Sequence, residues 1–143
     1  MHVETDLIDE ITLYVPNIAG QVNRALKALA EAEVNLLAFS LEQAGPYGIV
    51  RLIVSDMEKA KASLQKYAFG LTVTKVFAVA IPHEPGALQD VTEVLAANSI
   101  SIEYGYVAMP QKANQALILL KVSNEKEDEA RKFLASRDLN EIR

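Results

Sequence analysis

The sequence contains no cysteine and no tryptophan, and only two histidines among its 143 residues. The absence of cysteine excludes disulfide bonds, thiolate nucleophiles and cysteine-based metal sites. The two histidines, His2 and His83, are far apart in the chain and make a poor metal site. We therefore expect neither a metal nor a cofactor, and a chain without cysteine favours a cytoplasmic location.

Basic residues are not in excess, since the formal net charge is −5 and acidic residues are spread over both halves. Without a basic stripe to neutralise phosphates, nucleic acid is not an expected partner. The longest apolar runs, such as residues 76–81, are too short to span a bilayer, and no charged-then-apolar leader opens the chain. We therefore expect neither membrane association nor secretion.

What is present is typical of a globular protein, with 50% hydrophobic and 23% charged residues. A chain of this length forms one ordinary domain or two small ones. Each half alone is close to the lower size limit for a self-sufficient core, so two small units would gain by burying surface together.

The second half of the sequence repeats the first half with an offset of 66 residues. After the second predicted strand of each repeat the offset becomes 68, which makes one turn of the second repeat two residues longer. Length changes between repeats belong in loops, so this alignment is physically reasonable. The aligned pairs include Val15 with Ile81, Gly20 with Gly86, Leu29 with Leu95, and Val34 with Ile100.

The first repeat is predicted to have the order strand, helix, strand, strand, helix, strand. Apolar residues alternate over residues 11–15, as in a half-buried strand, and Pro16 and Gly20 end this strand. From Gln21 to near Glu33 the apolar residues recur at helical spacing. We predict further strands over residues 34–41, 48–54 and 71–77, and a second helix that begins at the N-cap Asp56 and ends at Gly70.

The second repeat follows the same order, with strands over residues 76–81, 100–108 and 116–122 and helices over residues 86–98 and 125–135. A turn is expected around Pro110, and the last strand of this repeat is short or missing. No linker separates the repeats, so residues 71–81 serve as the last strand of one and the first of the next, with a bend expected near Lys75.

This order predicts an α+β fold, a ferredoxin-like βαββαβ sandwich in two tandem repeats packed side by side, over residues 7–75 and 76–143. Right-handed crossovers place the helices on one face of an antiparallel sheet. The other face needs a cover, and a second copy of the chain is the simplest one, so we expect a homodimer.

The strand-to-helix segments, residues 15–22 and 81–88, resemble the signature of ACT domains, N-x-P-G followed by an aliphatic residue. The second segment is the more similar at Pro85-Gly86, whereas the first carries Ala19 where proline is usual. Residues 32–36 are similar to the opening of the family's second strand, and residues 47–54 are similar to its third strand. The chain thus resembles, over residues 8–136, a tandem ACT-domain protein, like the stand-alone two-ACT proteins named after the acetolactate synthase small subunit.

The resemblance implies a protein that senses amino acids and regulates metabolic enzymes or transporters. In this family the ligand commonly lies between the strand-to-helix loop of one domain and the second strand of a neighbouring domain. His83 and Ser101 depart from the family, because asparagine is usual at both positions. The expected ligand-binding residues are Asn17, Ile18, Ala19, Gly20, Gln21, Val22 and Asn35 for the first site, and His83, Glu84, Gly86, Ala87, Leu88 and Ser101 for the second.

The chemistry of the two strand-to-helix loops also indicates ligand binding there. A glycine at the start of a helix lets a ligand approach the backbone, and the unpaired N–H groups there favour a carboxylate. Asn17 offers donor and acceptor groups to an amino acid, and Asn35 would come from a neighbouring unit, although both are also ordinary turn residues. His83 either makes the second site pH-sensitive or is a surface turn residue. Arg51 pairs with Glu42 or a partner chain, or faces solvent.

Three functions remain. The first is an amino-acid-binding regulatory protein of amino-acid metabolism, with a small ligand such as serine, glycine or a branched-chain amino acid. The second is a regulatory subunit or interaction module that binds no ligand and associates with a metabolic enzyme. The third, an enzyme, is not expected, because no clustered histidine, aspartate and serine, no phosphate loop and no metal set are present.

Overall fold

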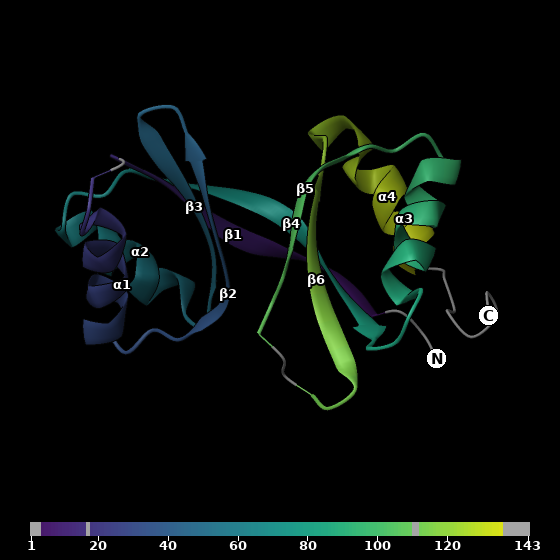
Figure 1. Cartoon of the computed structure of the whole chain (residues 1–143), viewed down its shortest axis with the longest axis horizontal. Coiled ribbons are helices and arrows are strands. Elements are labelled where there is room, and N and C mark those ends of the chain that lie inside the picture. The colour runs from purple at the N-terminus through teal and green to yellow at the C-terminus, as the bar shows by residue number, and fades with distance from the viewer. Residues whose placement is uncertain (1–3, 17, 110–111, 136–143) are drawn as a thin grey trace. The chain divides into compact units, whose positions relative to one another are not determined.

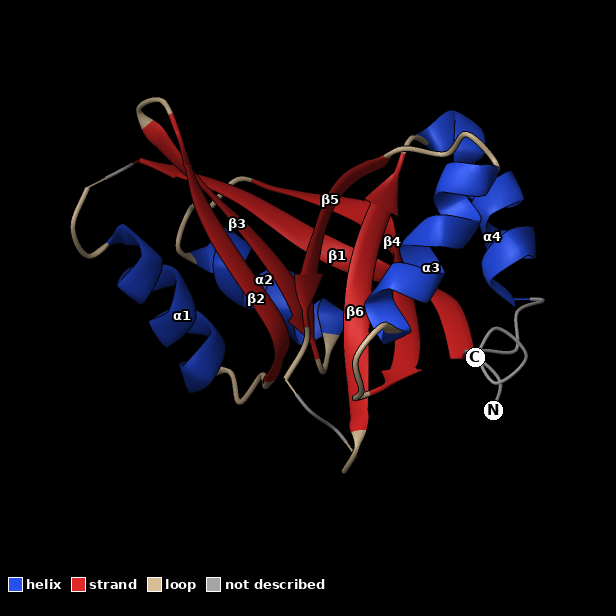
Figure 2. Ribbon diagram, turned by 45° about the vertical axis from the view of Figure 1, so that its right-hand side comes forward, coloured by secondary structure: helices blue, strands red, loops and turns tan. Residues whose placement is uncertain are grey.

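The computed structural model describes residues 4–16, 18–109 and 112–135 (Figure 1). Strands and helices follow one another in the predicted order, and Figure 2 shows the helices in two pairs, α1 with α2 and α3 with α4. The elements are β1 (Glu4–Pro16), α1 (Gln21–Glu31), β2 (Leu36–Ala44), β3 (Tyr47–Val54), α2 (Met57–Lys66), β4 (Leu71–Pro82), α3 (Ala87–Ala97), β5 (Ile102–Val107), β6 (Gln115–Val122), the short 3₁₀ helix η1 (Asn124–Lys126) and α4 (Glu127–Ala135).

The α+β fold with two tandem ferredoxin-like repeats is confirmed. The six strands described are antiparallel and have the order β2-β3-β1-β4-β6-β5. The chain divides into two compact units, with boundaries after Ile8 and after Thr74. We call Asp9–Thr74 the first unit, and the part from Lys75 onward together with the start of β1 the second unit.

The core of the first unit lies between its sheet and the pair α1 and α2. Alternate residues of β1 and β3 face the helices, which contribute the buried side of each amphipathic helix. The innermost members of this core are Ile11, Leu13, Leu29, Leu52 and Leu64. The predicted N-cap of α2 is also confirmed, since the Asp56 carboxylate accepts a hydrogen bond from the Lys59 N–H at 3.1 Å.

The second unit has an equivalent core between β4, β6, α3 and α4, with Phe77, Leu95 and Leu134 almost fully buried. Leu7, on the start of β1, packs against this core. β1 is therefore longer than the predicted strand over residues 11–15, because its first residues belong to the second unit and lie next to β4 in the strand order. The start of β1 therefore adds a strand beside β4 to the sheet of the second unit.

The strand β4 runs unbroken from Leu71 to Pro82. The bend expected near Lys75 does not interrupt it, although the boundary between the units falls at this position. The turn predicted around Pro110 lies outside the described residues.

The two repeats agree in detail where the first helix of each ends. Glu33 and Ser99, 66 positions apart, both have positive φ, at 59° and 57°. The next residue in each repeat, Val34 or Ile100, donates its N–H to the last turn of the helix at 2.9 Å. The offset found in the sequence is therefore a structural equivalence.

Candidate functional site

The loops between the first strand and the first helix of each repeat have the same backbone conformation. Gly20 and Gly86 are the N-caps of α1 and α3, with φ values of 92° and 85°. Nothing lies within 4 Å of a Cβ atom built on either residue. The left-handed backbone, and not a lack of space, therefore requires glycine at both positions.

The hydrogen bonds inside the two loops also match. In the first loop Ile18 N–H donates to Pro16 O at 2.8 Å and Gln21 N–H donates to Ile18 O at 3.2 Å. The equivalent bonds of the second loop, from Glu84 and Ala87, measure 3.0 and 3.3 Å. The first amide of each helix is thus used by the loop itself.

The next amide of each helix is available. Among the described residues, no group accepts a hydrogen bond from the N–H of Val22 or of Leu88, and neither N-cap glycine has a capping side chain. Unpaired N–H groups at a helix start favour an anion, with the helix dipole acting in the same direction.

A cavity of about 260 Å³, which we call the first cavity, opens beside the start of α1. One side of it comes from the end of β1 and the start of α1, and the other from the β2–β3 hairpin. Its lining is mostly apolar, with one carboxylate and one amide. The lining residues are Val15, Pro16, Ile18, Val22, Leu41, Glu42, Gln43 and Gly48.

The pairing of β1 with β3 explains the floor of the first cavity. Val15 lies opposite Gly48, which has no side chain. A Cβ atom at Gly48 would come within 3.4 Å of the side chains of Leu41 and Val15. In the second repeat Ile81 lies opposite Ala116, so a methyl group occupies the equivalent position.

Glu42 is held at the rim of the first cavity by an ion pair. Arg51 on β3 donates from Nη1 to Glu42 Oε1 on β2 at 2.5 Å. The Arg51 side chain is only 14% exposed, whereas that of Glu42 is 52% exposed. Of the alternatives open for Arg51, pairing with Glu42 is therefore confirmed, and the carboxylate keeps one side toward solvent.

The predicted residues of the first loop fall into two groups. Ile18 and Val22 line the first cavity, while Ala19, Gly20 and Gln21 form the loop and the helix start behind it. Asn17 lies outside the described residues, so its predicted role stays a proposal.

Asn35 lies at the opposite end of the sheet of the first unit. It precedes β2, whose first residue pairs with Val54, whereas the first loop adjoins the Tyr47 end of β3. There the backbones of Asn35 and Ser55 are joined by a hydrogen bond of 2.9 Å, and the Ser55 hydroxyl accepts another from the Asn35 N–H at 2.9 Å. Within one unit, Asn35 is not brought to the Gly20 loop.

The predicted residues of the second site divide in the same way. His83, Glu84, Gly86 and Leu88 are exposed around the second loop, and Ala87 is buried below it. His83 N–H donates to Asn114 O at 2.9 Å, which joins the loop to the start of β6. Ser101 lies at the other end of the unit, in an open hollow formed with Thr92, Ala96, Ser99, Ile100 and Ile102.

Sequence reasoning missed the four cavity residues of the β2–β3 hairpin, Leu41, Glu42, Gln43 and Gly48. The hairpin returns to the first loop only once the strand register is known. The available signal was Gly48 at the start of an apolar strand, where a side chain would normally pack.

The described residues contain no group of three or more histidine, aspartate or glutamate side chains arranged to hold a metal ion. In the same part of the chain, no helix is long and apolar enough to cross a membrane.

Comparison with solved structures finds several chains with the same fold. Protein BT0572 from Bacteroides thetaiotaomicron is 29% identical to this chain, with a TM-score of 0.81, covering 91% of this chain and 88% of that one. The regulatory subunit of aspartate kinase from Thermus thermophilus, in its ligand-free form, is 18% identical with a TM-score of 0.64, covering 94% and 95%. The corresponding subunit from Thermus flavus is 16% identical with a TM-score of 0.61 and the same coverage. The last two likenesses show a common fold.

None of the curated proteins compared with the chain matches it. A family model described as an ACT domain pair matches residues 6–143, which is nearly the whole sequence. ACT domains are regulatory and not catalytic modules. The resemblance seen in the two loop signatures is therefore confirmed, and the chain belongs to the ACT domain family as an ACT domain pair.

Proposed function

We propose that this chain is an amino-acid-binding regulatory protein of amino-acid metabolism and that the first cavity is its ligand site. The observation that carries the proposal is the first cavity itself, which opens beside the start of α1, where Val22 N–H has no acceptor among the described residues. A hollow next to a helix start combines room for a small molecule with a preference for a carboxylate.

The lining fits the three parts of an amino acid. The α-carboxylate lies at the start of α1, where Val22 N–H donates to it. The ammonium group faces the rim, where the Glu42 carboxylate and the Gln43 amide oxygen accept hydrogen bonds. The side chain lies among Ile18, Leu41 and Val15, so a small apolar amino acid suits the cavity best.

The size of the first cavity sets the upper limit of the ligand. Its volume of about 260 Å³ is below the range of about 300–1,000 Å³ that holds drug-sized ligands. Gly48 contributes to this volume because it leaves the floor open. The equivalent floor of the second repeat carries Ala116, so we assign the ligand to the first repeat.

A regulatory role follows from the family and is supported by the fold shared with the regulatory subunits of aspartate kinase. We propose that the chain acts on a metabolic enzyme in the cytoplasm and that it forms a homodimer. In such a dimer Asn35 of a neighbouring unit completes a ligand site, as the family resemblance implies.

The surface around the second loop favours a second candidate function, an interaction module that docks on a metabolic enzyme. Leu88, Val107 and Met109 are 44%, 60% and 51% exposed. They occupy positions equivalent to Val22, Leu41 and Gln43 of the first cavity, at the offset of 66. Exposed apolar side chains that gather at one place favour binding of another protein.

A thermal-shift screen against each of the twenty amino acids at millimolar concentration tests the proposal. Ligand present at about 100 times its dissociation constant raises the free energy of unfolding by about 2.7 kcal/mol, which gives a clear shift. We expect stabilisation by small apolar amino acids. If no amino acid stabilises the chain but a larger enzyme is retained on it in a pull-down, the interaction module replaces the ligand-binding proposal.

A further inference from the structure

The outer helical layers of the two units carry opposite charge. We call α1 with α2 the basic layer and α3 with α4 the acidic layer. The basic layer contains five basic and two acidic residues, and the acidic layer contains two basic and five acidic residues. The same fold therefore presents a positive helical surface in one repeat and a negative one in the other.

The charge is reversed at one exposed position that α1 and α3 share. The buried residues Leu29 and Leu95 set an offset of 66 between α1 and α3, which places Glu93 where the first repeat has Lys27. Both of these side chains are exposed.

The second pair of helices shows the same reversal. Buried Leu64 and Leu134 set an offset of 70 between α2 and α4, which places Glu129 where the first repeat has Lys59. Both residues are exposed. At these two positions the layers thus carry charges that attract each other.

At the same offset Glu58 and Lys61 align with Asp128 and Arg131, which have the same sign, so the difference between the layers lies in the overall charge of each. Glu129 is also paired with Lys126 at 3.1 Å.

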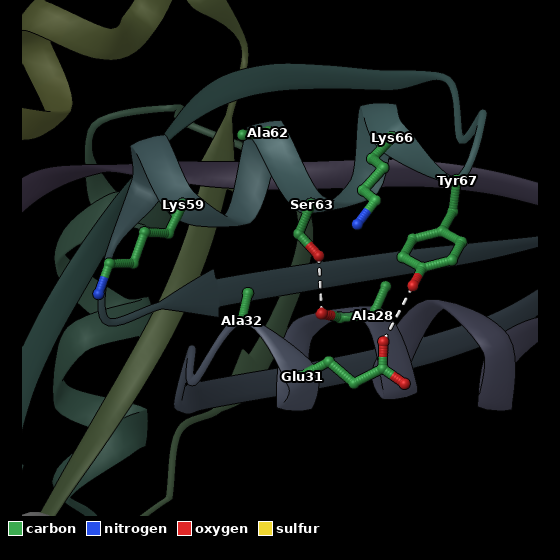
Figure 3. A pocket seen from close by; sticks show the side chains of 8 residues that line it. All are labelled: Ala28, Glu31, Ala32, Lys59, Ala62, Ser63, Lys66 and Tyr67. Atoms are coloured by element: carbon green, nitrogen blue, oxygen red, sulfur yellow. Dashed lines mark hydrogen bonds between the residues drawn. The ribbon is translucent and has the colours of Figure 1, made fainter.

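The basic layer also has a groove between its two helices, with a volume of about 410 Å³ (Figure 3). Its floor consists of small side chains, because the helices approach closely enough for Ser63 Oγ to donate to Ala28 O at 2.6 Å. Figure 3 shows Lys59 and Lys66 along the α2 side of this groove.

On the α1 side of the groove the carboxylate of Glu31 is already engaged. It accepts a hydrogen bond from the Tyr67 hydroxyl at 2.9 Å (Figure 3). Lys66 also lies near this pair, with Nζ 5.7 Å from the centre of the Tyr67 ring. An occupant of the groove therefore meets two lysines and a carboxylate that is hydrogen-bonded within the layer.

The outward side of α3 has the matching properties. α3 contains no basic residue, and its exposed residues include Gln89, Glu93 and Ala96, which share one side of the helix. A helix with small and acidic outward residues fits a groove that has a small-residue floor and a basic wall.

We infer that the basic layer is an interface for the acidic layer of a second copy of this chain, with α3 of one copy against the α1–α2 groove of the other. The contact is held mainly by charge, so it weakens as salt screens the lysines from the carboxylates. It uses neither the first cavity nor the second loop and does not depend on the proposed function.

Two charge-reversed forms of the full chain test this interface. The first carries Lys27→Glu with Lys59→Glu, and the second carries Glu93→Lys with Glu129→Lys. A matched control carries Lys75→Glu with Lys112→Glu, which makes the same change in net charge as the first form, and both residues are exposed and lie outside the four helices. Sedimentation velocity over a range of concentrations measures self-association, and circular dichroism verifies folding.

We expect the native chain to associate at low salt, and each charge-reversed form to associate at least about tenfold more weakly. The control behaves as the native chain does, and an equimolar mixture of the two charge-reversed forms associates again, because one native interface is restored between them. Three results would overturn the inference: no association of the native chain at low salt, unchanged association of both charge-reversed forms, or no recovery in the mixture.

Discussion

The hydroxyl of Tyr67, at the end of α2, donates a hydrogen bond of 2.9 Å to the carboxylate of Glu31 in the last turn of α1. The backbone carbonyl of Tyr67 also accepts a hydrogen bond from Arg24 at 2.6 Å, and the Arg24 guanidinium stacks 4.8 Å above the ring of Phe69. These contacts join α1 to the segment that follows α2, so the two helices of the basic layer are fixed at this end.

The pKa of Tyr67 is raised above 10.0 because its hydroxyl donates to Glu31, and the negative charge of Glu31 adds to the effect. A raised tyrosine pKa favours the neutral form in the folded state. The associated stability is therefore complete below the pKa of the unfolded chain and is lost as pH rises through the folded value. Glu31→Gln should lower the pKa of Tyr67 toward 10.0.

Alkaline titration of tyrosinate absorbance, taken as the difference between the chain and its Tyr67→Phe variant, measures this pKa. Glu33→Gln serves as the control, since Glu33 is exposed and has no hydrogen bond to Tyr67 among the described contacts. An unchanged pKa in Glu31→Gln would contradict the assignment of Glu31 as the cause.

We predict that the effect of replacing a glycine by alanine on the free energy of unfolding depends on the backbone φ at that position. Gly20→Ala and Gly86→Ala should each lower the free energy of unfolding by about 1–2 kcal/mol, because a left-handed backbone strains any residue with a Cβ atom. Urea denaturation measures the change.

Gly70→Ala is the matched control. Gly70 has no positive φ, and like the two N-caps it has open space where a Cβ atom would lie. At such a position alanine should stabilise the chain by about 0.4–1 kcal/mol. Equal effects at all three glycines would show that φ does not determine the outcome.

The hydrogen bond between the helices of the basic layer gives a further prediction. Ser63→Ala removes the hydroxyl that donates to Ala28 O, and should lower the free energy of unfolding by about 1 kcal/mol. The carbonyl keeps an acceptor role toward Ala32 N–H at 3.2 Å, so the loss stays moderate. Gln65→Ala is the control, because Gln65 lies on the exposed side of the same helix. It should change the free energy of unfolding by less than about 0.5 kcal/mol, measured by urea denaturation. A loss no larger than in this control would mean that the Ser63 hydroxyl does not stabilise the fold.

Much of the fold could be predicted because the same local signals for strands, turns and helices occur in both repeats of the sequence. Gly20 and Gly86 each follow a strand that ends in proline, and the helical spacing after them is regular. Asp56 is an N-cap with a helix immediately after it, and the structure confirms this cap. Local signals of this kind depend only on neighbouring residues, so they can be read without knowing the tertiary structure.

The start of β1 could not be predicted in this way. Residues 4–10 are mostly polar or charged and do not alternate cleanly, and only Leu7 reaches the core of the second unit. This part of the strand is stabilised by residues that come more than sixty positions later. Such long-range pairing leaves no periodic signal in the segment itself.

The candidate site was predicted in part. The loop residues Ile18 and Val22 line the first cavity, because the strand-to-helix turn is a local feature. Glu42 and Gly48 were not predicted as site residues, since their place beside the loop depends on the register of β3 with β1 and β2. Register is fixed by packing across the whole sheet and not by the hairpin sequence alone.

Calorimetric titration with L-valine tests the central claim, binding of a small apolar amino acid in the first cavity, most directly. The full chain is compared with Gly48→Val, which fills the floor of the first cavity, and with Ala116→Val, which makes a similar change at the equivalent position of the second repeat. Circular dichroism verifies that both variants fold. The account predicts that the native chain and Ala116→Val bind L-valine and that Gly48→Val does not. Absence of binding to the native chain, or equal binding by Gly48→Val, would contradict it.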